Sequence, residues 1–265
     1  MCHCRFVDFL VDNLSNQGVG SLRWAINEAN RIEGYDSITF DRSLAGSIIF
    51  LSNELGKITD AVEIIGLTNQ QGRPDIEINF GQNNGLVISG CVADNSKVAN
   101  IALTNSGSDG ILIDAADGIT IQNSFLGLSL DGVTGVGHSG NGLSITNNSS
   151  GNQIGGIDKI TGLNTFQRQT NLIGNNNLNG IFVEESFDNE IIGNSIGAAE
   201  NVNQELGNKM NGILLANEAN NNYIESNLIS GNNCNGIEVI QQSEQNLVTG
   251  NFIGVNQEGR HHIMN

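Results

Sequence analysis

Residues 212–235, GILLANEANNNYIESNLISGNNCN, hold three short apolar runs within 24 positions. The runs follow Gly212, Asn222 and Asn227, and the first alternates with a period of two, which is typical of a strand with one buried face. No helical periodicity separates the runs, so alternating strand–helix units are excluded. The turns also lack the two-residue signals of hairpins. The stretch therefore predicts one coil of an all-β solenoid.

The first run of this coil recurs along the chain as the pattern Gly–apolar–x–apolar. The six copies begin at Gly85, Gly110, Gly142, Gly180, Gly212 and Gly236. If each copy starts a new coil, equivalent residues lie above one another at the ~4.8 Å spacing of neighbouring strands. The middle residues of the copies then form one outward row: Val87, Leu112, Ser144, Phe182, Leu214 and Glu238. We expect loops to cover this apolar row, or the row to be a contact surface.

Asparagine marks the start of the second strand in successive coils. The residues concerned are Asn152, Asn189, Asn222 and Asn246. A side-chain amide both donates and accepts hydrogen bonds, so stacked asparagines can bond along the solenoid axis. We predict that these four form such a ladder. A further asparagine follows five residues later, at Asn194, Asn227 and Asn251, and opens the third strand.

Every second coil is predicted to carry a polar loop on the same side. The loops are 128–141, 198–211 and 255–265, and an extra segment at roughly 157–170 interrupts the period. Surface insertions are one explanation. A shared ligand-binding ridge is the other, and its expected hydrogen-bonding acids are Asp131, Glu200, Glu205 and Glu258.

The two ends of the sequence differ. Ser21 is a plausible helix N-cap, and apolar residues at 22, 25, 26 and 29 predict an amphipathic helix that covers the N-terminal end. We expect residues 1–8 to stand apart, residues 9–265 to form the β-helix, 9–52 to hold the cap and first strands, and 53–265 to form coils. Ile48 and Phe50 belong to these first strands. No C-terminal cap is visible, so we expect a truncated end and end-to-end self-association there.

Composition excludes several classes of partner. The chain has 41 asparagines, 34 glycines and a net charge of −17, with only 11 Lys and Arg. This charge argues against nucleic acids and anionic membranes. No apolar run is long enough for a membrane span. Residues 1–12 lack the pattern of a signal peptide, and we expect none in this chain.

Several stretches resemble bacterial secreted and surface proteins with pectin-lyase-like right-handed parallel β-helices (PbH1 repeats). They are GVGSLRWAINEAN (18–30), DSITFDRSLAG (36–46), NQIGGIDK (152–159), NLIGNNNLNGIFV (171–183), NEIIGNSIG (189–197) and NLISGNNCNGIEV (227–239). The resemblance covers residues 9–265. It implies a right-handed helix and an extracellular or cell-surface location. It does not fix an activity, because the family includes lyases, hydrolases, epimerases, adhesins and tailspikes.

An enzyme of this family needs clustered acids on one outer face. The best such group is Asp109, Asp114 and Asp117, with His138 on the nearby loop. Asp next to Gly is more often turn chemistry than catalysis. We expect no metal site: Cys2-His3-Cys4 lacks a second ligand pair, and residues 155–158 only partly match a calcium-binding repeat. No cofactor is expected, although Ca²⁺ stays open without a motif for it.

Three functions remain open from the sequence. The first is a non-enzymatic module of a surface or secreted protein that serves as a stalk, adhesin or glycan-binding surface. The second is a polysaccharide lyase or glycoside hydrolase. The third is a structural spacer.

Overall fold

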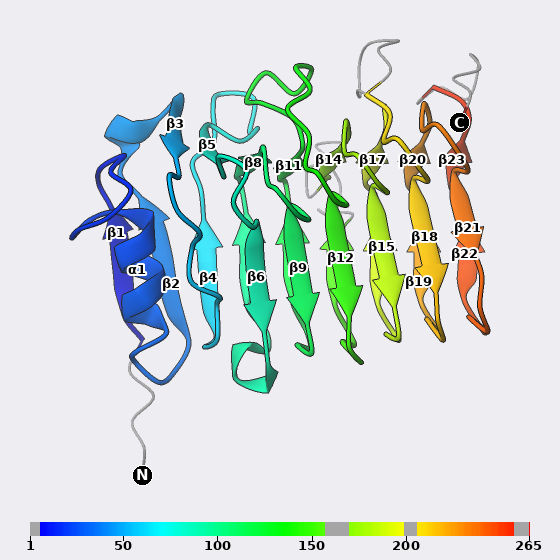
Figure 1. Ribbon diagram of the computed structural model, residues 1–265, viewed down its shortest axis with the longest axis horizontal. Coiled ribbons are helices and arrows are strands. Elements are labelled where there is room, and N and C mark those ends of the chain that lie inside the picture. The colour runs from blue at the N-terminus through cyan, green and yellow to red at the C-terminus, as the bar shows by residue number, and fades with distance from the viewer. Residues whose placement is uncertain (1–5, 157–169, 199–205, 257–264) are drawn as a thin grey trace, which may run out of the picture.

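The computed structural model describes residues 6–156, 170–198, 206–256 and 265, and shows a right-handed parallel β-helix (Figure 1). Three parallel sheets of nine, eight and six strands make up the coils; from β6 onward each coil contributes one strand to each sheet, whereas the coils before β6 have no strand in the third sheet. The predicted fold class is therefore confirmed.

The strands are short, and each pairs with the strand one coil before and one coil after it. Sheet A contains β1 (Asp8–Val11), β2 (Asp36–Phe40), β4 (Val62–Ile65), β7 (Lys97–Ala99), β10 (Thr120–Gln122), β13 (Gln153–Gly155), β16 (Glu190–Ile192), β19 (Tyr223–Glu225) and β22 (Leu247–Thr249). Sheet B contains β3 (Ser47–Phe50), β5 (Ile76–Asn79), β8 (Ala102–Thr104), β11 (Phe125–Leu126), β14 (Leu172–Ile173), β17 (Ser195–Ile196), β20 (Leu228–Ile229) and β23 (Phe252–Ile253). Sheet C contains β6 (Leu86–Ser89), β9 (Ile111–Asp114), β12 (Leu143–Thr146), β15 (Ile181–Glu184), β18 (Ile213–Ala216) and β21 (Ile237–Val239).

The six Gly–apolar–x–apolar segments are the six strands of sheet C. Their register pairs Val87 with Leu112, Leu112 with Ser144, Ser144 with Phe182, and so on to Glu238, as the sequence predicted. The first and third residues point inward, where Ile111, Ile145 and Ile181 are fully buried. Burial of such stacked isoleucines in every coil is the main favourable term for this fold.

The one α-helix among the described residues covers the N-terminal end of the coil stack (Figure 1). It is α1 (Leu22–Ala29), and the Ser21 hydroxyl accepts a hydrogen bond from the Trp24 N–H at 3.2 Å. Leu22, Ala25, Ile26 and Ala29 are buried against the first strands, as predicted. Two short 3₁₀ helices, Arg42–Leu44 and Cys91–Ala93, lie in connections. In β3 the buried residue is Ile49, whereas Phe50 is 64% exposed.

Long and short connections alternate between sheets B and C. The connections β8–β9, β14–β15 and β20–β21 are short, whereas β11–β12 and β17–β18 are long, and all leave from the same edge of the helix (Figure 1). The extra segment near 157–170 falls between β13 and β14 and lies almost entirely outside the described residues. From β8 to β21 the connections alternate in length as predicted, although residues 199–205 of β17–β18 lie outside the described residues; β5–β6, which comes before them, is also short.

The loop after β11 covers a different face from the one that we expected. Leu128, Leu130 and Val133 pack on the outer side of sheet B, over Phe125 and Leu172. The outward row of sheet C stays half-buried at Val87, Leu112, Phe182 and Leu214, while Ser144 is buried. Apart from β17, which begins with Ser195, the two-residue strands of sheet B carry an apolar side chain on both faces, which is why an outer cover is needed there.

Candidate functional site

The turns that follow the strands of sheet C adopt left-handed backbone. Such turns favour Gly or Asn, because other side chains clash with the following carbonyl. Here, however, Glu185 (φ 46°), Glu218 (φ 61°), Gln241 (φ 53°) and Gln242 (φ 59°) occupy these positions. Strained residues that are not Gly cluster at functional sites, so these turns are a candidate binding surface.

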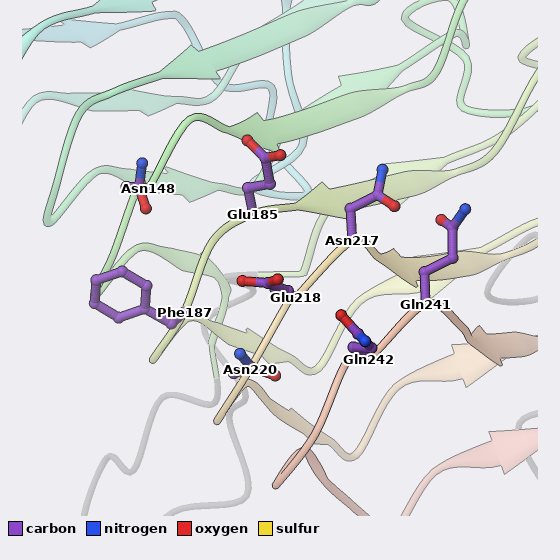
Figure 2. A pocket seen from close by; sticks show the side chains of 8 residues that line it. All are labelled: Asn148, Glu185, Phe187, Asn217, Glu218, Asn220, Gln241 and Gln242. Atoms are coloured by element: carbon purple, nitrogen blue, oxygen red, sulfur yellow. The ribbon is translucent and has the colours of Figure 1, made fainter.

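These turns enclose a groove of about 660 Å³. It extends across four consecutive turns, those after β12, β15, β18 and β21 (Figure 2). The lining residues are Asn148, Glu185, Phe187, Asn217, Glu218, Asn220, Gln241 and Gln242. The groove lies on the edge of the β-helix opposite the long loops, because the loops join sheet B to sheet C and these turns join sheet C to sheet A (Figure 1).

The backbone of the turns is held firmly, so the groove has a fixed shape. The Asn148 N–H donates to the Glu185 carbonyl at 2.8 Å, and the Glu185 N–H donates to the Asn217 carbonyl at 2.9 Å. The Glu218 N–H donates to the Gln241 carbonyl at 3.0 Å. Each turn is therefore bonded to the next, and side chains from successive turns lie side by side (Figure 2).

Most of the polar side chains in the groove have no hydrogen-bond partner among the described residues. Those of Glu185, Glu218, Gln241 and Gln242 belong to this group, and all four residues are exposed. Two others are engaged: Asn217 Nδ2 donates to a Glu184 carboxylate oxygen, and Asn220 Oδ1 accepts from the Glu244 N–H at 2.6 Å. The first group is therefore available to an external ligand.

Phe187 adds an aromatic surface to this polar lining. Its side chain is 38% exposed, while its backbone bridges Ser150 on one side and Asn220 on the other. An exposed ring beside unpaired carboxylates and amides is a typical feature of sites that bind partly polar ligands.

The surroundings of the groove are strongly acidic. Within the described residues from 170 to 256 the acids are Glu184, Glu185, Asp188, Glu190, Glu218, Glu225, Glu238 and Glu244, and the cation is Lys209. Lys209 Nζ donates to Asn177 Oδ1 at 2.6 Å, on the loop side of the molecule. A second hollow of about 350 Å³ continues the groove past Glu218 to Glu244 and Gln245. No cation lines either hollow.

The structure places the predicted catalytic residue Asp109 within a ladder of side chains. Asp109 Oδ1 accepts from the Asn141 N–H at 2.7 Å and from Asn141 Nδ2 at 3.2 Å. The Asn141 side chain in turn accepts from Asn179 Nδ2, and Asn179 accepts from Asn211 Nδ2. Asp109 therefore stabilises the coil stack at this position.

His138 occupies a second ladder. Its side chain is fully buried, its N–H donates to Asn176 Oδ1 at 3.2 Å, and its Nδ1 accepts from the Ser106 N–H at 3.1 Å. Burial lowers the pKa of His138 to about 3, and the nearby Leu103 carbonyl opposes this only partly. The ring is therefore neutral and shielded from solvent.

The two remaining predicted acids lie on the outer surface. Asp114 accepts from Ser89 Oγ at 3.0 Å and from Asn147 Nδ2 at 2.6 Å, and Asp117 accepts from the Ser150 N–H at 2.7 Å. Both bind groups in a neighbouring coil. The four predicted catalytic residues are thus distributed over two ladders and one turn.

A repeated five-residue motif explains why Asp109 and His138 are members of ladders. The stretches 106–110 (SGSDG), 138–142 (HSGNG), 176–180 (NNLNG), 208–212 (NKMNG) and 232–236 (NNCNG) are equivalent in the structure. The fifth residue of the motif must be glycine, because a Cβ at Gly180 would lie 2.9 Å from Asn208 Nδ2 of the next coil. Sequence reasoning missed this motif, since its first position changes from Ser to His to Asn.

The predicted asparagine ladder is confirmed. Nδ2 of Asn152, Asn189 and Asn222 donates to Oδ1 of the next member at 2.8, 3.0 and 3.1 Å, ending at Asn246. Three further asparagine ladders run beside it: Asn171–Asn194–Asn227–Asn251, Asn176–Asn208–Asn232–Asn265 and the Asn141–Asn179–Asn211 ladder that Asp109 joins. All four satisfy buried polar groups at the corners of the helix.

The expected ligand-binding ridge is only partly described. Asp131 accepts from the Val133 and Thr134 N–H groups and from the Thr134 hydroxyl, so it shapes its own loop. Although burial acts in the opposite direction, these bonds hold the pKa of Asp131 below its usual value. Glu200, Glu205 and Glu258 lie outside the described residues.

The described part of the chain contains no group of three or more His, Cys, Asp or Glu side chains placed to hold a metal ion. No helix in it is long and apolar enough to cross a membrane.

Comparison with known proteins gives matches at the level of structure. No family model matches this sequence, and no curated protein matches it. Pectate lyase Pel9A is similar over 96% of this chain and 81% of its own, with 12% identity and a TM-score of 0.49. ORF18 of Geobacillus virus E2 is similar over 93% and 58% (12% identity, TM-score 0.49), and the Dettilon tailspike protein over 92% and 50% (16% identity, TM-score 0.47).

Proposed function

We propose that the chain is a non-enzymatic β-helix module of a bacterial surface or secreted protein, and that it binds a glycan in the groove lined by Glu185, Phe187 and Glu218. The observation that supports this most directly is the set of unpartnered carboxylates and amides beside an exposed aromatic ring. Sugar hydroxyls both donate and accept, so they match amide and carboxylate side chains, while a sugar ring packs on an aromatic face.

The repetition of the groove also favours an extended ligand. Polar side chains recur in each turn, at the ~4.8 Å spacing of the coils, so several weak contacts add along a chain molecule. The left-handed turn positions further support a ligand. Gly or Asn there would make the folded state more stable, yet the chain has Glu and Gln side chains without partners.

The test is a binding screen of the 265-residue chain against a panel of polysaccharides and oligosaccharides. The critical variant is Phe187→Ala, and the matched control is Phe50→Ala, which removes an exposed ring outside the groove. Affinity for the bound glycan should fall about 3- to 10-fold in Phe187→Ala, the usual worth of one aromatic contact, and stay unchanged in the control.

Other outcomes decide between the alternatives. The same polysaccharides are assayed for new reducing ends and unsaturated products. Turnover that disappears in Asp114→Asn or Asp117→Asn would make the chain a lyase or hydrolase. If no glycan binds and none is cleaved, the remaining function is that of a structural spacer.

A further inference from the structure

We propose that the groove selects a glycan that carries protonated amines, that is, a polymer or oligomer of amino sugars with free amino groups. This inference rests on the proposed glycan-binding function and specifies its ligand class. It starts from the charge and pairing of the groove residues.

The carboxylates of Glu185 and Glu218 face the groove with no cation to neutralise them. Neither makes a salt bridge, and the salt bridge found among the described residues, Arg31–Glu28, lies at the other end of the molecule. Glu244 lines the hollow that continues the groove and adds a third carboxylate there. Several unneutralised carboxylates gathered in one groove favour a ligand that carries positive charges.

The geometry also favours a sugar over a simple polycation. Exposed amides from Asn148, Gln241 and Gln242 lie among the carboxylates, and they match hydroxyl groups rather than additional charges. Phe187 offers a face for a sugar ring and for an ammonium group above that ring. A basic peptide would use the charges but leave most of the amides without partners.

The probes are a β-1,4-linked glucosamine hexamer and the same hexamer with every amine acetylated, at a pH where the free amines are protonated. A hexalysine peptide and an oligouronate complete the set. We expect the glucosamine hexamer to bind about tenfold more tightly than the acetylated one at low salt. The difference should shrink at high salt, because the charges are exposed. The oligouronate should not bind.

The variants are Glu185→Gln and Glu218→Gln, which keep the shape of the side chain and remove its charge. Glu190→Gln is the matched control, since Glu190 is exposed on sheet A in the same coil as Glu185 but does not line the groove. Together the two groove variants should bring the two hexamers within about twofold of each other, while the control keeps the tenfold preference.

The outcomes separate this inference from the function on which it rests. Equal binding of both hexamers, weakened by Phe187→Ala, would overturn the amine selectivity and keep the glycan site. Hexalysine binding as tight as the glucosamine hexamer would overturn the selection of a sugar. Binding of neither hexamer, with another glycan bound in the screen and weakened by Phe187→Ala, would also overturn the amino-sugar assignment. If no glycan in the screen binds, the proposed function fails as well.

Discussion

His138 continues a ladder of asparagines through Asn176: its backbone N–H donates to Asn176 Oδ1 at 3.2 Å, while its Nδ1 accepts from Ser106 as an asparagine oxygen would. Because Nδ1 accepts, the ring proton resides on Nε2. Protonation of Nδ1 would break the bond to Ser106 and place a charge in the core.

This relationship makes stability depend on pH. The folded pKa of His138 is about 3, below the ~6.5 of an unfolded histidine, so the folded state favours the neutral ring. The stabilisation that the neutral His138 ring gives the folded state is complete above pH ~6.5 and is lost progressively as the pH falls toward 3. We expect the free energy of unfolding to fall by about 2 kcal/mol between pH 6.5 and 5 from this group.

Urea unfolding at several pH values checks this, with His138→Asn as the control. Asparagine restores the residue found at 176, 208 and 232, so the variant should fold and lose the pH dependence that belongs to His138. Parallel curves for the wild type and His138→Asn would show that the ring is not kept neutral by burial.

Asp109 gives a second prediction, which separates a structural from a catalytic carboxylate. Asp109→Ala leaves the N–H and Nδ2 of Asn141 without their acceptor and should lower the free energy of unfolding by about 1–3 kcal/mol. Asp109→Asn keeps an oxygen acceptor and should stay within about 1 kcal/mol of the wild type. Equal losses in both variants would mean that the negative charge itself is required.

The confirmed ladder gives a third prediction. Asn222→Ala removes bonds to Asn189, Asn246 and the Ser186 carbonyl, and should lower the free energy of unfolding by about 1–3 kcal/mol. The control is Asn221→Gly, because Asn221 is exposed and has a φ of 55°, where alanine would add strain of its own. A loss as large in the control would place the critical amide one residue earlier.

The coil stack and the first ladder were predictable because each rests on one residue type at constant spacing. Isoleucine at 111, 145 and 181 and asparagine at 152, 189 and 222 keep their chemistry from coil to coil. The ladder through Ser106, His138 and Asn176 was missed because three different residue types occupy the equivalent position in successive coils, and each bonds to the next coil through its backbone N–H. The sequence makes Asp109 a catalytic candidate only if the chain is an enzyme and favours a turn role; its bond to Asn141 makes it a ladder member.

The groove could not be predicted from spacing. Asn148, Glu185 and Gln241 are three different residue types, and the turns that hold them differ in length. What unites these residues is the left-handed backbone, which only the path of the chain reveals. The same limit applies to the loop after β11, because the outer rows of sheets B and C are both apolar and nothing in the sequence states which one Leu128 and Leu130 cover.

The coil formed by β21, β22 and β23 gives a fourth prediction. Leu247, Val248, Phe252 and Ile253 are 56%, 43%, 47% and 43% exposed. Exposed apolar side chains on strands at the edge of three sheets favour self-association. Sedimentation of the 265-residue chain should show association that decreases in the Leu247→Glu, Phe252→Glu double variant. A strictly monomeric wild type at high concentration would contradict this.

Glu218 gives the last prediction, in which stability and binding change in opposite directions. Its φ of 61° is unfavourable for a glutamate, and the side chain makes no hydrogen bond that offsets the strain. Glu218→Asn places a residue there that tolerates left-handed backbone, so the free energy of unfolding should rise by about 0.5–1 kcal/mol. The shorter side chain also loses its charge, so binding of an amine-bearing glycan in the groove should weaken.

Thermal unfolding and binding of the glucosamine hexamer measure the two effects on the same preparation. Asn95→Gly is the control for backbone relief, since Asn95 is exposed outside the groove, already tolerates its φ of 64° and should gain little stability. Higher stability without weaker binding would show that Glu218 does not contact the ligand. A loss of stability would show that its side chain supports the turn.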